Sequence, residues 1–211
     1  MKILMYGDSI TDLGRSWERD HAPDSYGYGY VYYVASDLFK DDPTKYEIIN
    51  RGVGGSRIVD LYARIKASVW NFEPDVLSVL CGVNDVWHEL DHQNGVEPKR
   101  WEKVYRMMIE DTLARLPNVK IIICEPFILK GSKTQERYDE FLKIKDYAVI
   151  AKKLAEEYGL YFLPLQEKFD AVAEKYPTEV YLYDGVHPNI AGSRLIADEW
   201  VKLFTEKIAR D

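Results

Sequence analysis

Residues near both ends of the chain have the chemistry to transfer an acyl group. Ser9 lies within Gly7-Asp8-Ser9, directly after a run of four apolar residues, and Asp184 lies three residues before His187. A serine hydroxyl becomes a nucleophile when a base with a pKa near neutrality takes its proton, and histidine, with a pKa of about 6.5, is such a base. A carboxylate beside the imidazole holds its tautomer and stabilises the imidazolium that forms. These residue types predict Ser9 as a nucleophile, His187 as its base and Asp184 as the partner of that base.

Each of these features also has a simpler interpretation. Gly, Asp and Ser are all favoured in turns, so residues 7–9 also describe an ordinary strand-to-loop turn. Asp184 and His187 alone are also consistent with a helix-capping aspartate beside a surface histidine. The acyl-transfer hypothesis therefore depends on which other residues the fold brings to the same place.

Two further segments carry hydrogen-bond donors of the kind that acyl transfer requires. They are the glycine-rich residues 52–55 and Asn84, and each follows an expected strand. Acyl transfer builds negative charge on the carbonyl oxygen, and removing one preorganised donor typically slows such reactions about 100–1,000-fold. A glycine N–H lets that oxygen approach closely, and an asparagine amide is a neutral donor. Taken alone, the glycines also suit a tight turn, and Asn84-Asp85 suits a helix cap.

Other chemistries fit the same segments less well. The glycines match neither the dinucleotide-binding nor the Walker phosphate-binding pattern. Asp8 and Asp12 suggest a phosphatase or metal pair, but no further cluster of carboxylates and histidines accompanies them. We therefore expect no metal and no other cofactor.

The elements that must position these residues alternate between apolar runs and helical patterns. The expected strands cover residues 3–6, 46–50, 76–81, 119–124 and 160–163. Apolar residues recur with a helical period over residues 58–69, 101–116, 141–155 and 195–204. Continuous apolar strands separated by amphipathic helices are typical of a parallel sheet covered on both faces. We predict an α/β fold, a three-layer α/β/α sandwich with a five-stranded parallel sheet, as a single domain over residues 1–211.

Prolines and two longer segments define the expected helix starts and loops. Pro98 and Pro188 are expected to open helices. Residues 15–33 are expected to begin as a loop and to run into a helix that ends near Phe39. Residues 87–97 are expected to form a second loop. Both loops leave the carboxyl ends of strands, so they should rise around the same rim of the sheet.

Composition excludes several classes of partner. The 211 residues carry a net charge of −7 and no basic run, which argues against nucleic acid or an anionic membrane surface as the partner. No apolar run approaches the roughly 18 residues expected of a membrane-spanning helix. The first expected strand starts at Lys2, which leaves no room for a signal peptide, so we expect a cytoplasmic protein. Cys81 and Cys124 are expected to be free thiols.

Four segments, taken in order, resemble the sequence blocks of the SGNH, or GDSL-type, hydrolases. They are Gly7-Asp8-Ser9, residues 50–55, Gly82-x-Asn84-Asp85 and Asp184-x-x-His187. The resemblance covers nearly the whole chain and implies the flavodoxin-like fold of that family. It implies Ser9 as the nucleophile, His187 as the base and Asp184 as the residue that orients the base.

The resemblance also implies an oxyanion hole. Its donors would be the N–H of Ser9, the side chain of Asn84 and the N–H of Gly55, with Gly54 as the alternative glycine. Asn50 and Asp85 are expected to brace the rim loops rather than to act on substrate.

Longer stretches resemble bacterial carbohydrate acetylesterases of the acetylxylan esterase kind. They read GDSITDLGR from residue 7, GYVYYV from residue 29 and GVNDVW from residue 82. A lipase pocket would have a continuous aliphatic lining, whereas the expected rim is rich in aromatic and polar side chains. This rim suits a small acyl group on a polar carrier, so we predict an oligosaccharide ester as the substrate. Asp8, Trp87 and Tyr183 are the predicted substrate contacts, although most other tyrosines are expected in the core or at a subunit contact.

Three other functions remain open at this point. The chain could be a thioesterase or lysophospholipase for longer acyl chains, or a non-catalytic carbohydrate-binding protein on the same fold. A flavodoxin-like nucleotide binder fits least, since no phosphate loop is present. The aromatic content of 13% and the resemblance to esterases that assemble are compatible with a homo-oligomer.

Overall fold

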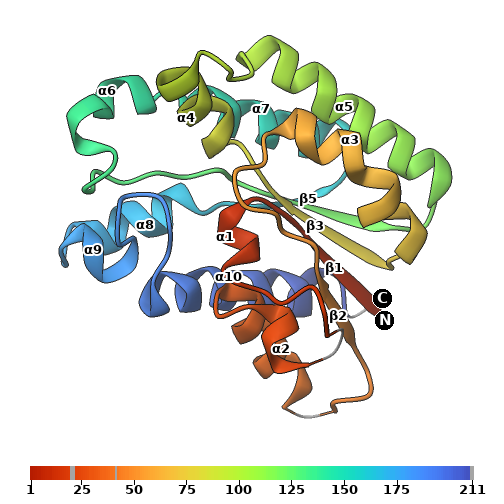
Figure 1. Cartoon of the computed structure of the whole chain (residues 1–211). Coiled ribbons are helices and arrows are strands. Elements are labelled where there is room, and N and C mark those ends of the chain that lie inside the picture. The colour runs from red at the N-terminus through yellow and green to blue at the C-terminus, as the bar shows by residue number, and fades with distance from the viewer. Residues whose placement is uncertain (20–21, 41, 210–211) are drawn as a thin grey trace.

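A five-stranded parallel sheet lies at the centre of the computed structural model, which describes residues 1–19, 22–40 and 42–209 (Figure 1). The strands are β1 Lys2–Gly7, β2 Glu47–Asn50, β3 Val76–Leu80, β4 Lys120–Cys124 and β5 Tyr161–Leu163. They lie in the order β2-β1-β3-β4-β5, and every neighbouring pair is parallel. The predicted α/β class and the five parallel strands are confirmed.

Helices cover both faces of this sheet. The described α-helices are α1 Ser9–Asp12, α2 Tyr30–Phe39, α3 Ile58–Ser68, α4 Val83–His92, α5 Pro98–Arg115, α6 Tyr138–Phe141, α7 Ile144–Glu157, α8 Gln166–Ala173, α9 Thr178–Tyr181 and α10 Ile190–Lys207. The described 3₁₀ helices are η1 Pro23–Tyr26, η2 Trp70–Phe72 and η3 Gln135–Arg137. Figure 1 shows α2 and α10 together on one face and α3, α5 and α7 on the other, which confirms the three-layer sandwich.

The central strands are mostly apolar because both of their faces are covered, and Ser78 is a buried polar exception. The side chains of residues 3–6 in β1 and all five residues of β3 are buried. The register pairs Gly7 with Leu80 and Leu80 with Cys124. The segments that follow β1, β3 and β4 therefore leave the sheet at the same edge, where ligands of open α/β sheets bind.

The structure corrects the predicted loop at residues 87–97. Residues 87–92 belong to α4, and only residues 93–97 connect it to α5. The buried Val83 and Val86 share one face of α4, while polar side chains cover most of the remainder. The short apolar stripe is therefore easily taken for part of a loop. The helix ends where Gln93 adopts a left-handed conformation with φ of 51°.

Other boundaries also differ from prediction. Pro98 opens α5 as expected, but Pro188 lies before α10, whose first turn is capped by the Asn189 side chain on the N–H of Ala191. The helix ending at Phe39 is present as α2. Helices α8 and α9 were not predicted from the apolar pattern. Within the described ranges, no helix combines the length and the apolarity needed to cross a membrane.

Candidate active site

The serine at the end of β1 opens a short helix rather than lying in a simple turn. Asp8 is the N-cap of α1, and its Oδ1 accepts the N–H of Ile10 at 2.9 Å. Ser9 is thus the first residue of a helix that starts at the carboxyl edge of the sheet. A Cβ at Gly7 would overlap the carbonyl oxygen of Leu80 and the hydroxyl of Thr11, so only glycine allows this tight strand-to-helix transition.

The structure brings Ser9, His187 and Asp184 into one hydrogen-bonded chain. Ser9 Oγ lies 2.8 Å from His187 Nε2, and His187 Nδ1 lies 2.7 Å from Asp184 Oδ2. An ionised carboxylate can only accept hydrogen bonds. The imidazole hydrogen is therefore on Nδ1, and Nε2 accepts the hydrogen bond from the serine hydroxyl. This arrangement is the one that general-base activation of a hydroxyl requires.

Asp184 is held in place by backbone groups of its own loop. Its Oδ1 accepts the N–H groups of Val186 and His187 at 2.9 and 2.8 Å. Burial raises the pKa of Asp184, but the hydrogen bonds from the His187 ring and from these two N–H groups lower it more, so the net pKa lies below its usual value. The carboxylate is therefore ionised at neutral pH, ready to stabilise an imidazolium.

The glycine loop after β2 places Gly55 and Gly54 differently. The N–H of Gly54 donates to Asp12 Oδ2 at 3.1 Å. No hydrogen-bond acceptor for the Gly55 N–H is found within the described part of the chain. Gly55 also has a φ of 76°, a left-handed conformation that favours glycine. Of the two candidate glycines, Gly55 is the one whose N–H is available to a ligand.

The third candidate donor comes from the first turn of α4. Asn84 is 7% exposed, and its Nδ2 donates to the carbonyl oxygen of Ser56 at 3.2 Å. An amide nitrogen carries two hydrogens, so one N–H of Asn84 remains for a ligand oxygen. The N–H of Ser9 lies in the first turn of α1, where N–H groups lack intrahelical acceptors. Each of the three predicted donors thus lies on a segment that leaves the carboxyl edge of the sheet.

Asn50 and Asp85 bind the backbone of these loops, as expected. Asn50 Nδ2 donates to the carbonyl of Thr11 at 2.7 Å, and its Oδ1 accepts the N–H of Gly52 at 2.9 Å. The carboxylate of Asp85 accepts the N–H of Ile58 at 3.0 Å and is fully buried. Burial raises the pKa of Asp85 to about 8. Asn50 thus joins the loop after β2 to α1, and Asp85 joins α4 to the start of α3.

Two aromatic rings flank the imidazole of His187. The Tyr183 ring stacks on it with centroids 5.6 Å apart and planes at 16°, and the Trp87 ring lies 6.0 Å away, tilted by 49°. Trp87 Nε1 donates to Asp91 at 2.8 Å, and its ring packs edge-on against Phe141, so its orientation is fixed. Tyr183 is 53% exposed. Trp87 is half-buried, and the contact of either ring with substrate stays a prediction.

Asp8 occupies a different position from the two rings. It is 1% exposed, and its Oδ2 is buried without a hydrogen-bond partner in the described structure. Burial raises the pKa of Asp8 to about 6. The carboxylate caps α1 from beneath the serine, and its predicted contact with substrate stays a prediction.

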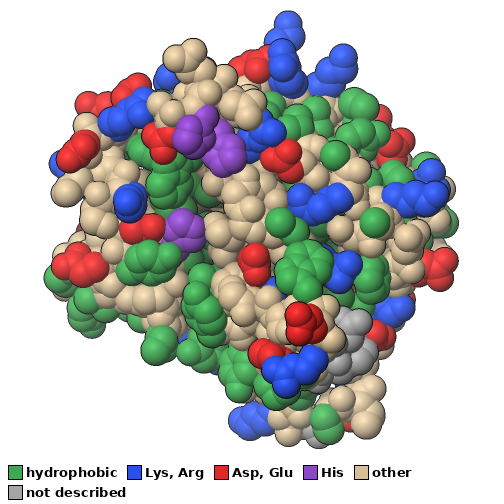
Figure 2. Space-filling model, in the orientation of Figure 1, with side chains coloured by type: hydrophobic (Ala, Val, Ile, Leu, Met, Phe, Trp, Pro, Cys, Tyr) green, Lys and Arg blue, Asp and Glu red, His purple; other side chains and the backbone are tan. Residues whose placement is uncertain are grey.

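His88 lies within residues 87–97, which the sequence places on the rim, but its position beside Gly55 was not predicted. A Cβ added at Gly55 would lie 3.9 Å from His88 Nε2, which places this imidazole beside the candidate oxyanion hole. Burial, then the nearby Arg57, lowers the pKa of His88. The spacing of four residues places His88 on the same face of α4 as Asn84. Figure 2 shows histidine side chains on this face among hydrophobic and acidic ones.

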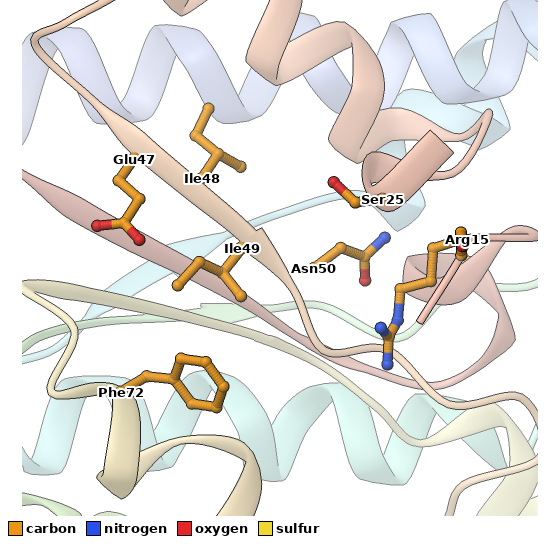
Figure 3. Close-up of a pocket in the computed structure, with 8 residues that line it drawn as sticks. Arg15, Ser25, Glu47, Ile48, Ile49, Asn50 and Phe72 are labelled. Atoms are coloured by element: carbon orange, nitrogen blue, oxygen red, sulfur yellow. The ribbon is translucent and has the colours of Figure 1, made fainter. Parts of the chain in front are cut away.

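A pocket at the β2 edge lies behind the glycine loop. Figure 3 shows Glu47, Asn50 and Phe72 around it, together with Arg15, whose Nε donates to the carbonyl of Gly52 at 3.0 Å. Neither Ser9 nor His187 lines this pocket. It is therefore distinct from the hydrogen-bonded chain at the serine. The described residues also hold no cluster of three or more His, Cys, Asp or Glu side chains suited to a metal ion.

Comparison with known proteins gives consistent matches. Residues 5–195 match the model of the GDSL-like Lipase/Acylhydrolase family. An acetylxylan esterase of Geobacillus stearothermophilus is 32% identical over 209 residues, which is 95% of this chain and 92% of that protein.

Solved structures agree with this result. A putative GDSL-like lipase from Parabacteroides merdae is 36% identical, with a TM-score of 0.89 over 98% of this chain and 96% of that one. The acetylxylan esterase Axe2 of Geobacillus stearothermophilus is 28% identical, with a TM-score of 0.84 over 96% of this chain and 93% of that one. Catalytic mutants of Axe2 that replace a serine, an aspartate or a histidine by alanine have also been solved.

Proposed function

The chain belongs to the GDSL-like lipase/acylhydrolase family and is a carboxylic ester hydrolase. We propose that it removes acetyl groups from xylo-oligosaccharides or related carbohydrates through an acyl-enzyme on Ser9. The observation that carries the proposal is the hydrogen-bonded chain from Ser9 through His187 to Asp184, beside the donors of Gly55 and Asn84. No cofactor is part of it.

The first half of the reaction forms the acyl-enzyme. Ser9 Oγ attacks the acetyl carbonyl carbon while its proton passes to His187 Nε2. Negative charge develops on the carbonyl oxygen, where the N–H groups of Ser9 and Gly55 and the amide of Asn84 stabilise it. The imidazolium, stabilised by Asp184, then donates its proton to the departing sugar hydroxyl as the carbon–oxygen bond to the carrier breaks.

The second half returns the enzyme to its starting state. Water takes the place of the sugar, and His187 Nε2 removes a proton from it as it attacks the acyl carbon. The second oxyanion collapses, Ser9 Oγ leaves with the proton from His187, and acetic acid is released and ionises to acetate in water. Every proton moves between Ser9, His187, water and the carrier, so the residues present balance the reaction.

Two observations support the carbohydrate carrier. The 53% exposed ring of Tyr183 and the neighbouring Trp87 offer aromatic faces beside the base, where the leaving sugar would lie. An acetylxylan esterase is also among the relatives, and the serine, aspartate and histidine of Axe2 catalytic mutants are residue types that this chain brings together. The cytoplasmic location and a homo-oligomer stay predictions.

Acetate release from acetylated xylo-oligosaccharides tests this function. Wild-type protein should release acetate, and Ser9→Ala should release none while keeping its circular dichroism spectrum and its Tm. Comparing p-nitrophenyl acetate with the octanoate and palmitate esters separates this function from a thioesterase or lysophospholipase. Preference for the long esters would reject the acetyl assignment, and activity retained by Ser9→Ala would reject the acyl-enzyme.

A further inference from the structure

Asp12 links the nucleophile helix to the glycine loop. It is the last residue of α1, three positions after Ser9. Its Oδ2 accepts the N–H of Gly54 at 3.1 Å, and its Oδ1 accepts the N–H of Arg15 at 3.3 Å. A single carboxylate thus bridges two rim segments that are 42 residues apart in the sequence.

We propose that Asp12 is a positioning residue for the oxyanion hole: by holding the N–H of Gly54, it sets the orientation from which Gly55 presents its own N–H to the carbonyl oxygen. The proposal rests on the proposed esterase function, because it assigns Asp12 a role in the same site.

The loop is fastened to α1 and β1 up to Gly54, and Asp12 provides the last of these attachments. Asn50 binds the carbonyl of Thr11, and the N–H of Val53 donates to the carbonyl of Gly7 at 3.0 Å. A Cβ at Gly52 would overlap the backbone of Asp12, which shows how tightly the loop packs on the helix.

Beyond Val53 come two adjacent glycines, which have the greatest backbone freedom of all residues. Within the described residues, the one side-chain hydrogen bond to this glycine pair is the bond from the Gly54 N–H to the Asp12 carboxylate. Gly54 also lies beside the nucleophile, since a Cβ added there would be 3.9 Å from Ser9 Cβ. A small rotation of Gly54 would therefore displace the Gly55 N–H relative to the serine.

Asp8 and Asp12 do not form a shared site, although their spacing suggests one. Asp8 caps α1 through the N–H of Ile10, whereas Asp12 reaches outward to Gly54. Each carboxylate binds a different backbone segment. Asp8 therefore positions the helix that begins with the serine, and Asp12 positions the glycine loop after β2.

The effect of Asp12 should appear in kcat, since an oxyanion donor acts on the transition state more than on the bound ester. For Asp12→Ala we expect kcat for p-nitrophenyl acetate to fall 10–100-fold with KM within threefold. The inhibition constant of phenylboronic acid, which forms a tetrahedral adduct on serine, should rise by a similar factor. Asp12→Asn keeps an oxygen acceptor and should retain kcat within about fivefold, whereas Asp12→Glu keeps the charge but displaces the acceptor and should lose activity.

Asp42→Ala is the matched control. Asp42 is exposed and precedes β2, at the amino end of that strand and away from the carboxyl ends where Ser9 lies, so its replacement should leave kcat and KM unchanged. The Tm of each variant is measured alongside. Asp12→Ala with kcat within twofold of wild type overturns the proposal, as does a loss carried by KM or an Asp12→Asn variant as impaired as Asp12→Ala. Wild-type protein without Ser9-dependent hydrolysis overturns both proposals, whereas active wild type with unimpaired Asp12→Ala overturns only this one.

Discussion

Replacing Asn84 by alanine should slow catalysis far more than it destabilises the fold. Its buried Nδ2 donates one hydrogen to the carbonyl of Ser56 at 3.2 Å, and the other is the donor assigned to the oxyanion in the proposed reaction. Losing an oxyanion donor costs about 100–1,000-fold in kcat, or about 2.7–4 kcal/mol of transition-state stabilisation. Losing the bond to Ser56 costs about 1 kcal/mol of folding free energy, which a domain with about 5–15 kcal/mol of stability tolerates.

The assay therefore compares kinetics with stability in the same variants. Steady-state hydrolysis of p-nitrophenyl acetate gives kcat and KM, and urea denaturation gives the free energy of unfolding. Asn84→Asp, which replaces the donor by an acceptor, should be at least as slow as Asn84→Ala. Asn94→Ala is the matched control, because Asn94 is exposed in the loop after α4. A loss of kcat below tenfold in a folded Asn84→Ala variant would refute the role of Asn84 as an oxyanion donor.

Two further predictions concern acyl selectivity and pH. Trp87→Ala removes a ring that Asp91 holds beside His187. The ratio of kcat/KM for p-nitrophenyl octanoate to kcat/KM for p-nitrophenyl acetate should therefore rise at least tenfold. An unchanged ratio would mean that Trp87 does not limit the size of the acyl group. Because burial raises the pKa of Asp8 to about 6, this group stabilises the fold fully below pH about 4 and loses that contribution as pH rises through about 6. The unfolding free energy of Asp8→Asn minus that of wild type should therefore be up to about 3 kcal/mol higher at pH 7 than at pH 4. Urea denaturation measures this difference, and an equal difference at both pH values would contradict the prediction.

The strands and the layered architecture were predictable because each central strand is a short and almost entirely apolar run. Residues 3–6 and the five residues of β3 are buried on both faces, so their composition alone distinguishes them from alternating strands. The helix α4 was harder to recognise, since its buried face is short and polar residues follow it closely. Periodicity over fewer than three turns carries too little information to separate a helix from a loop.

The choice between Gly54 and Gly55 depends on a contact that no local pattern contains. Both glycines satisfy the same motif, and both could supply an N–H. The Gly54 N–H donates to Asp12, a residue of helix α1, and this leaves the Gly55 N–H for a ligand. Likewise, the motif does not distinguish a surface Asp8 from the buried N-cap that it forms. Long-range packing decides such questions, and single-sequence reasoning has no access to it.

The position of the base depends on a part of the chain that carries none of the recognised motifs. Asp184 and His187 are set relative to each other by local hydrogen bonds, but their approach to Ser9 is set by the segment after β4. There the N–H of Leu129 donates to the carbonyl of Gly185, and the N–H of Lys133 donates to that of Asp184. Gly185 has a φ of 98°, and a Cβ there would meet the carbonyl of Leu129 at 2.6 Å.

Thr134 completes this support. Its buried hydroxyl donates to the carbonyl of Leu129 at 2.7 Å and accepts the N–H of Gly131 at 2.8 Å. The segment at residues 129–134 thus forms a closed turn on which the loop carrying Asp184 and His187 rests. Serine and histidine come from opposite ends of the chain, so their 2.8 Å separation depends on this turn as well as on the sheet register. A change at residues 129–134 would therefore shift His187 relative to Ser9, although none of these residues takes part in the proposed chemistry.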